Sequence, residues 1–418
     1  MYDVFSLKDF SFPKDFIWGA ATAGHQIEGD NIHSQLWARE YAPDSTCTPS
    51  GKACNSYVLY EEDIKLLKQI GLKNYRMSIE WSRIEPIEGQ FEQKEIDHYV
   101  KLLSRLCEEG IKPYVTLHHF THPLWYEKLG GFNNEENVKY FLRYVEKVVP
   151  FIAPYTHSFN VINEFNQGWE NISYKRCMLR CHAGAYQIIK QHTDATVSTV
   201  HAYVWADPYR KFDTPDRILG EWTDYMFNEF FFHAIRTGEV VLPETDVLYL
   251  PELKDSCDYW AMNFYTRNHA DMRRSSRFNQ AYPHKRMQMI KSGFYLEEMI
   301  PEGMTNLLMR CKDKPVIITE NGLCCDDDRF RLVYMTLYLE AIKEAIDLGV
   351  DVRGFFYWSL MDNYEWGTYL PKFGIVDVDF ETFKRTLKPS AYFYRGIIEE
   401  NAVTQENLRK YLKELPIL

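Results

Sequence analysis

The sequence contains no apolar run long enough to span a membrane, no surplus of basic residues and no leader-like start. No window of about 18 or more residues is apolar throughout, so we expect no transmembrane helix and no membrane partner. The formal net charge is −11, whereas nucleic-acid-binding proteins typically carry a basic surface, so we expect no nucleic acid partner. The first residues lack a basic region followed by an apolar stretch, which argues against a signal peptide. The nine cysteines are an odd number and, without a secretory signal, they favour a reduced, cytoplasmic chain.

Linkers, internal repeats and low-complexity segments are also absent, so nothing in the sequence divides residues 1–418 into separate domains. Short apolar runs instead alternate with segments of helical spacing, a pattern that predicts a parallel sheet. Eight such units in 418 residues predict an α/β fold with a single (β/α)8 TIM barrel. The expected strands are residues 16–23, 74–79, 112–119, 158–164, 195–204, 258–266, 316–319 and 352–359. The expected helices are residues 60–70, 95–106, 133–149, 175–191, 224–236, 331–348 and, as the last, 388–399, and residues 267–300 are expected to form an irregular surface segment near the barrel mouth.

Two glutamates stand directly at the ends of expected strands. Glu320 follows the apolar run 316–319, and the pair Asn321-Gly322 then turns the chain. Glu164 ends the strand 158–164 in the same way. Either acid alone could equally well cap the segment that follows it. The carboxyl ends of barrel strands meet at one mouth, however, and two facing carboxyl groups are what glycoside hydrolysis requires.

A series of short motifs runs through the chain in a fixed order. They are Phe12-Pro13, residues 18–23 with 26–29, residues 75–79, residues 115–119, Asn163-Glu164, residues 318–322, residues 358–366 and residues 384–391. On these motifs the sequence resembles glycoside hydrolase family 1, the β-glucosidase family, over nearly its whole length. The most specific of them is the stretch 358–366, WSLMDNYEW.

The resemblance implies retaining hydrolysis of small soluble β-glycosides, with neither a metal ion nor an organic cofactor. Glu320 would be the nucleophile that attacks the anomeric carbon. Glu164 would protonate the leaving oxygen and then deprotonate the incoming water. Arg76 and Tyr265, at positions that match the family, would support the ionised form of Glu320. The expected substrates are β-glucosides, with β-galactosides or β-fucosides as secondary ones.

The resemblance also places a set of residues around the sugar, with Trp358 as the floor beneath the ring. Aromatic residues form 16% of the chain, so Trp358 could also be an ordinary core residue. Glu365 would contact the 4-OH and 6-OH, and a carboxylate there disfavours 6-phosphorylated sugars. A carboxylate at position 164 disfavours the myrosinase branch. The complete expected substrate-binding set is Gln26, His119, Asn163, Asn263, Trp358, Glu365 and Trp366.

Two departures from the family pattern keep other functions open. Phe165 follows Glu164 where proline is usual, and Phe120 stands where tryptophan is usual. Phenylalanine at these two positions is faintly similar to the pattern in relatives that transfer glycosyl groups to acceptors other than water. The alternatives are therefore a transglycosylase, which product analysis with an added acceptor would identify, and a sugar-binding relative without turnover. The sequence leaves the aglycone and the oligomeric state open.

Two further groups of residues could be interpreted as sites of another kind. One group is a possible metal cluster of three histidines, His118, His119 and His122. Neighbouring strand residues point to opposite faces, however, so we expect no metal site. Cys324 and Cys325 follow the Glu320 motif closely. A redox role for them would require a lowered thiol pKa, which the sequence alone does not indicate.

Overall fold

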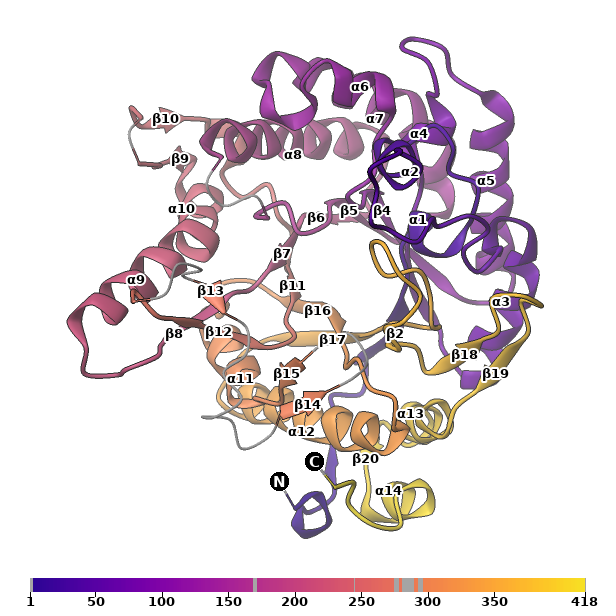
Figure 1. Cartoon of the computed structure of the whole chain (residues 1–418), viewed down its shortest axis with the longest axis vertical. Helices are drawn as coiled ribbons and strands as arrows, with labels where there is room; N and C mark the ends of the chain where they lie inside the picture. Colours follow the sequence, from indigo (N-terminus) through magenta and orange to yellow (C-terminus); the bar gives the residue numbers. More distant parts are fainter. Residues whose placement is uncertain are drawn as a thin grey trace.

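Nine parallel strands form the centre of the protein in the computed structural model, which describes residues 3–167, 171–243, 245–273, 278–279, 289–291 and 296–417. The strand order is β6-β5-β4-β3-β2-β17-β16-β11-β7, and the strands curve around a common axis (Figure 1). Their bounds are β2 (Ile17–Ala21), β3 (Asn74–Ser78), β4 (Lys112–His118), β5 (Ser158–Ile162), β6 (Thr196–Ser198), β7 (Val200–Ala202), β11 (Trp260–Asn263), β16 (Val316–Asn321) and β17 (Val352–Trp358).

The two ends of this strand order are pieces of one predicted strand. The expected strand 195–204 is divided into β6 and β7, with only Thr199 between them. β6 pairs with β5 on one side, and β7 pairs with β11 on the other. The ring therefore returns to its start, and the nine strands are the eight predicted ones with one divided. The fold is the predicted (β/α)8 TIM barrel.

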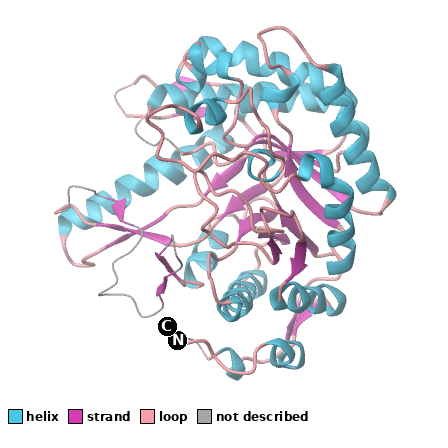
Figure 2. Ribbon diagram, turned by 45° about the vertical axis from the view of Figure 1, so that its right-hand side comes forward, coloured by secondary structure: helices cyan, strands magenta, loops and turns pink. Residues whose placement is uncertain are grey.

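Helices surround the strands on the outside (Figure 2). In α5 (Gln93–Glu108) the buried residues Ile96, Tyr99, Leu103 and Leu106 recur every three or four positions, so one face packs on the barrel. Most predicted helices lie within a few residues of the observed ones. The helices in this layer include α3 (Ser56–Ile70), α5, α7 (Val138–Ile152), α8 (Ile172–His192), α12 (Asp328–Asp347) and α13 (Pro389–Glu400).

Three helix predictions were wrong in their bounds or their order. The helix expected at 133–149 begins only at Val138, because two short 3-10 turns, Gly131–Asn133 and Glu135–Asn137, precede it. The helix expected to be last is followed by α14 (Gln405–Tyr411), which begins at a cap made by the side chain of Thr404.

The helix expected at 224–236 is the end of a longer helical segment. α9 (Thr214–Asp224) starts ten residues earlier, where the side chain of Asp213 caps it. A π-helical turn, Tyr225–Glu229, then connects α9 to α10 (Phe230–Thr237).

The segment 267–300 is not irregular from its start. β12 (Arg267–Ala270) pairs in parallel with β8 (Trp205–Pro208), outside the barrel. A two-stranded pair, β14 (Met289–Lys291) with β15 (Leu296–Glu298), lies further along. The remainder of that prediction falls largely on 274–277, 280–288 and 292–295, outside the described residues. None of the described helices is long and apolar enough to cross a membrane.

Candidate active site

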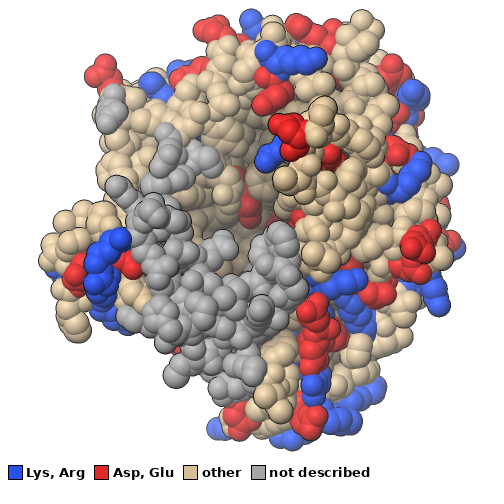
Figure 3. Space-filling model, viewed as in Figure 1, with Lys and Arg blue, Asp and Glu red and all other residues tan. Residues whose placement is uncertain are grey.

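A cavity of about 270 Å³ opens at the barrel mouth, where the carboxyl ends of the strands meet. Figure 3 shows the hollow, with acidic atoms inside it. All but one of the predicted site residues line this cavity; the exception, Arg76, lies behind Glu320. The lining members are Gln26, His119, Asn163, Glu164, Asn263, Tyr265, Glu320, Trp358, Glu365 and Trp366.

Glu320 is held at both of its carboxylate oxygens. Arg76 Nη1 donates to Oε1 at 2.5 Å, and the Tyr265 hydroxyl donates to Oε2 at 2.7 Å. Arg76 is itself fully buried, and its Nε and Nη2 donate to Asn160 Oδ1 at 3.1 Å and Asn163 Oδ1 at 2.6 Å. A paired guanidinium and a hydroxyl donor bind one oxygen each and fix the orientation of the carboxyl group.

Glu164 has different surroundings. It follows β5 in a left-handed backbone conformation, with φ of 46°. Asn263 Nδ2 donates to its Oε1 at 3.1 Å, and Gln167 Nε2 donates to its Oε2 at 3.2 Å. Burial and then the charge of Glu320 raise the pKa of Glu164 to about 7, against the opposing effects of these two amides and Arg76. This carboxyl group therefore retains its proton close to neutral pH.

Hydrogen bonding fixes the protonation of His119. Because Asn163 Oδ1 accepts from Arg76, the amide nitrogen of Asn163 is the donor to His119 Nε2, at 3.1 Å. His119 is then neutral, with its proton on Nδ1. Burial, with the charge of Arg76, holds the pKa of His119 well below its ordinary value, in agreement with this state.

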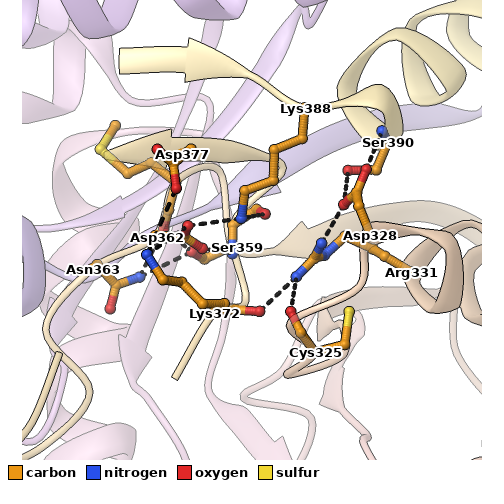
Figure 4. Close-up of polar contacts among 12 residues, drawn as sticks. Cys325, Asp328, Arg331, Ser359, Asp362, Asn363, Lys372, Asp377, Lys388 and Ser390 are labelled. Atoms are coloured by element: carbon orange, nitrogen blue, oxygen red, sulfur yellow. Dashed lines mark hydrogen bonds and ion pairs between the residues drawn. The ribbon is translucent and has the colours of Figure 1, made fainter. Parts of the chain in front are cut away.

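A polar network holds the loop after β17 on the side away from the cavity (Figure 4). Asp362 accepts from Lys388 Nζ at 2.7 Å, and Asn363 Nδ2 donates to Ser359 Oγ at 2.9 Å. Asn363 Oδ1 in turn accepts from Gln26 Nε2 at 2.9 Å, which connects the network to the cavity. On the cavity side, Trp358 Nε1 lies 3.4 Å from Glu365 Oε1. The aromatic and acidic side chains at the end of β17 are therefore held on a rigid support.

Cys324 and Cys325 are both buried beside this network. The Cys325 carbonyl accepts from Arg331 Nη2 at 3.4 Å, as Figure 4 shows. Burial raises the pKa of the Cys325 thiol to about 12, which is opposite to the change that a reactive thiol needs. For Cys325 the structure therefore gives no support to the redox interpretation.

His118 and His119 point to opposite sides of their strand, as expected. His118 Nε2 lies 3.4 Å from His122 Nδ1, and His122 Nε2 pairs with Glu127 at 2.9 Å. His119 instead lines the cavity. Across the described part of the chain, no group of three or more His, Cys, Asp or Glu side chains is arranged to hold a metal ion.

Several residues that lie at the site were not identified from the sequence. Asn160 accepts from Arg76, and Thr319 Oγ1 donates to Asn263 Oδ1 at 2.7 Å. Both are polar residues inside strands that are otherwise buried and apolar, which is a signal that could have identified them. Gln167, which binds Glu164, comes from a loop and has no such signal.

The sequence profile of glycosyl hydrolase family 1 matches residues 8–403. The chain belongs to glycosyl hydrolase family 1. It is 30% identical to beta-glucosidase A of Acetivibrio thermocellus over 458 aligned positions, which span 94% of this chain and 100% of the relative.

Solved structures of this glycosyl hydrolase family have the same fold. A beta-glycosidase from Pyrococcus horikoshii superposes with a TM-score of 0.86 at 32% identity, over 96% of this chain and 98% of that one. A family 1 β-glucosidase from Thermotoga maritima, in complex with isofagomine lactam, gives a TM-score of 0.86 at 27% identity, over 94% and 100%. This family 1 member is therefore a glycoside hydrolase that acts on O-glycosidic bonds, of the β-glycosidase type.

Proposed function

We propose that this family 1 enzyme is a retaining β-glucosidase that hydrolyses small β-glucosides by double displacement, within a single domain. The observation that carries the proposal is the contrast between two carboxyl groups at one cavity. Glu320 accepts from Arg76 and Tyr265, which suits a nucleophile. Glu164 has its pKa raised to about 7, which suits a general acid. We also propose that the enzyme is cytoplasmic, as the sequence predicts.

In the first step, Glu320 attacks the anomeric carbon while Glu164 gives its proton to the departing oxygen. The glycosyl ester that forms removes the negative charge of Glu320. That charge is the second largest cause of the raised pKa of Glu164, so the pKa falls once the ester exists. Glu164 can then take a proton from water, which attacks the same carbon and releases the sugar with its configuration retained.

The sugar is expected to lie on Trp358 with its hydroxyls facing the polar lining of the cavity. Asn163 is positioned by Arg76 and His119 to donate to the 2-OH, a contact that strengthens in the transition state. Gln26 Oε1 has no hydrogen-bond partner among the described residues, which suits an acceptor for a sugar hydroxyl. Glu365 would accept from the 4-OH and 6-OH. Galactosides and fucosides, which differ at these positions, are proposed as secondary substrates.

The function is tested with the wild-type protein and a panel of aryl β-glycosides that differ only at the 4-OH and 6-OH. We expect the glucoside to have the highest kcat/KM, and proton NMR of the first product to show the β-anomer before mutarotation. Release of the α-anomer first would contradict the retaining mechanism. Binding of the whole panel without turnover would contradict enzymatic hydrolysis altogether.

The raised pKa of Glu164 predicts a pH dependence that differs between leaving groups. An alkyl glucoside needs the protonated acid, so its kcat/KM should fall as the pH rises through about 7 rather than near the ordinary 4.5. A dinitrophenyl glucoside needs no proton on its leaving group, so its profile should stay flatter over the same range. The measurement is kcat/KM against pH for both substrates, and superimposable alkaline limbs would argue against Glu164 as the acid.

A further inference from the structure

The barrel has one seam that backbone pairing does not close, and it lies beside Glu164. β5 pairs with β6 as far as Asn160 opposite Ser198. Beyond Thr199 the chain continues as β7, whose backbone pairing is with β11. Among the described strands no ladder joins β5 to β7, although Figure 1 shows β5, β6 and β7 in succession at the barrel centre.

Side chains close this seam instead. Thr199 Oγ1 donates to the Ile162 carbonyl at 2.9 Å. Nearer the mouth, Asn166 Nδ2 donates to the Ala202 carbonyl at 2.7 Å, while the Ala202 N–H donates to Asn166 Oδ1 at 3.0 Å. A carboxamide has the donor and the acceptor of a peptide group, so these two bonds reproduce a pair of ladder bonds. Asn166 Nδ2 also donates to the Phe227 carbonyl, at 3.2 Å, in the π-helical turn.

Asn166 lies two residues after Glu164 and is fully buried. Glu164 has a φ of 46°, a conformation that a residue with a side chain adopts only when its neighbours impose it. The Gln167 N–H donates to the Glu164 carbonyl at 3.0 Å and closes the turn around Asn166. The side chain of Asn166 therefore anchors the turn that carries the carboxyl group.

Ala202, which binds the Asn166 side chain, is also paired with a residue that holds the Glu164 carboxyl group. Ala202 is paired with Asn263 in the β7–β11 ladder. Asn263 Nδ2 donates to Glu164 Oε1 at 3.1 Å. Ala202 is therefore connected to Glu164 in two ways. It is hydrogen-bonded to Asn166 in the turn that carries Glu164, and it is paired with Asn263, which binds the Glu164 side chain. A shift at this point would move both supports of the carboxyl group.

We propose that Asn166 is a positioning residue that closes the barrel seam and thereby sets the place of the Glu164 carboxyl group. The inference rests on the proposed acid/base role of Glu164. A misplacement of about 1 Å can cost about 10²-fold in rate, so a small opening of the seam is enough to be measured. The effect should appear only in steps that use Glu164.

The test compares Asn166→Ala with wild type on an alkyl and a dinitrophenyl β-glucoside. We expect kcat/KM to fall about 10- to 100-fold for the alkyl substrate and less than about threefold for the dinitrophenyl one, because only the former needs proton donation. The matched control is Asn137→Ala, a buried asparagine that donates to the Leu129 and Gly131 carbonyls at 3.0 and 2.9 Å. It should lower Tm and leave the ratio of the two substrates unchanged.

Asn166→Ser, which keeps one hydroxyl for Ala202, is the milder second variant and should give an intermediate ratio. Equal losses on both substrates would overturn the inference, and so would insolubility of both variants while Asn137→Ala folds, since Asn166 would then serve stability alone. The proposed function fails on separate results: no hydrolysis by wild type, release of the α-anomer first, or no dependence of Glu164→Ala on the leaving group.

Discussion

Glu320→Gly is expected to reduce the hydrolysis of aryl β-glucosides by at least about 10⁴-fold, because glycine has no carboxylate to form the glycosyl ester. The partners of the removed group, Arg76 and Tyr265, remain in place and the cavity becomes larger by one side chain. An α-glucosyl fluoride has its fluorine on the face that Glu320 would occupy, so it can enter as a substitute for the intermediate. Transfer to an added alcohol or sugar should then return, measured as fluoride release and as β-linked product.

Glu320→Gln is the matched control for this experiment. Its amide has nearly the volume of the carboxylate, so it removes the nucleophile without opening space for fluorine. We expect it to be as inactive as Glu320→Gly in hydrolysis but not to use the α-fluoride. Hydrolysis at the wild-type rate by Glu320→Gly would refute the assignment of the nucleophile.

The strand ends could be predicted because two rules act on them at once. A parallel strand buried on both faces is a short, mainly apolar run, and the functional residues of a barrel gather at the carboxyl ends of its strands. Glu320 and Glu164 stand out for that reason. The cavity at these strand ends is also lined by the residues that the motif resemblance predicted to bind the sugar.

The division of the strand 195–204 could not be predicted, because it results from the strands that pair with each half, β5 and β11, and not from the residues of the strand itself. Both halves are short and, apart from the exposed Thr196, buried, and Thr199 between them is an ordinary strand residue. Asn166 was missed for a related reason. Its role depends on Ala202, 36 positions away, and an asparagine two residues after the expected strand 158–164 more often belongs to a turn.

The early start of α9 has a local signal that was overlooked. Asp213 precedes Pro215 at the first turn, and this combination of a capping residue and proline is typical of a helix start. The π-helical turn after α9 has no such signal. Its Phe227 carbonyl accepts from Asn166, so its geometry is connected to tertiary contacts at the seam.

Glu164→Ala is expected to have its largest effect on substrates with poor leaving groups. For an alkyl β-glucoside we expect kcat/KM to fall about 10³- to 10⁴-fold, because no other group donates the proton to the departing oxygen. For a dinitrophenyl β-glucoside the first step needs no proton, so kcat/KM should remain within about tenfold of wild type. Equal losses on the two substrates would contradict the acid role.

The same variant also separates the second role of Glu164 from the first. With the dinitrophenyl donor, the glycosyl ester on Glu320 forms quickly but water attacks it without a base, so kcat and KM should fall together as the ester accumulates. Azide is an anionic nucleophile that needs no deprotonation, so adding it should raise kcat and yield the β-glycosyl azide. Glu164→Gln, which keeps the side-chain volume, is the matched control and should respond less, because its amide occupies the space that azide needs. If azide changed neither kcat nor the products, Glu164 would have no role as the base, and the pKa cycling that links it to Glu320 would lose its support.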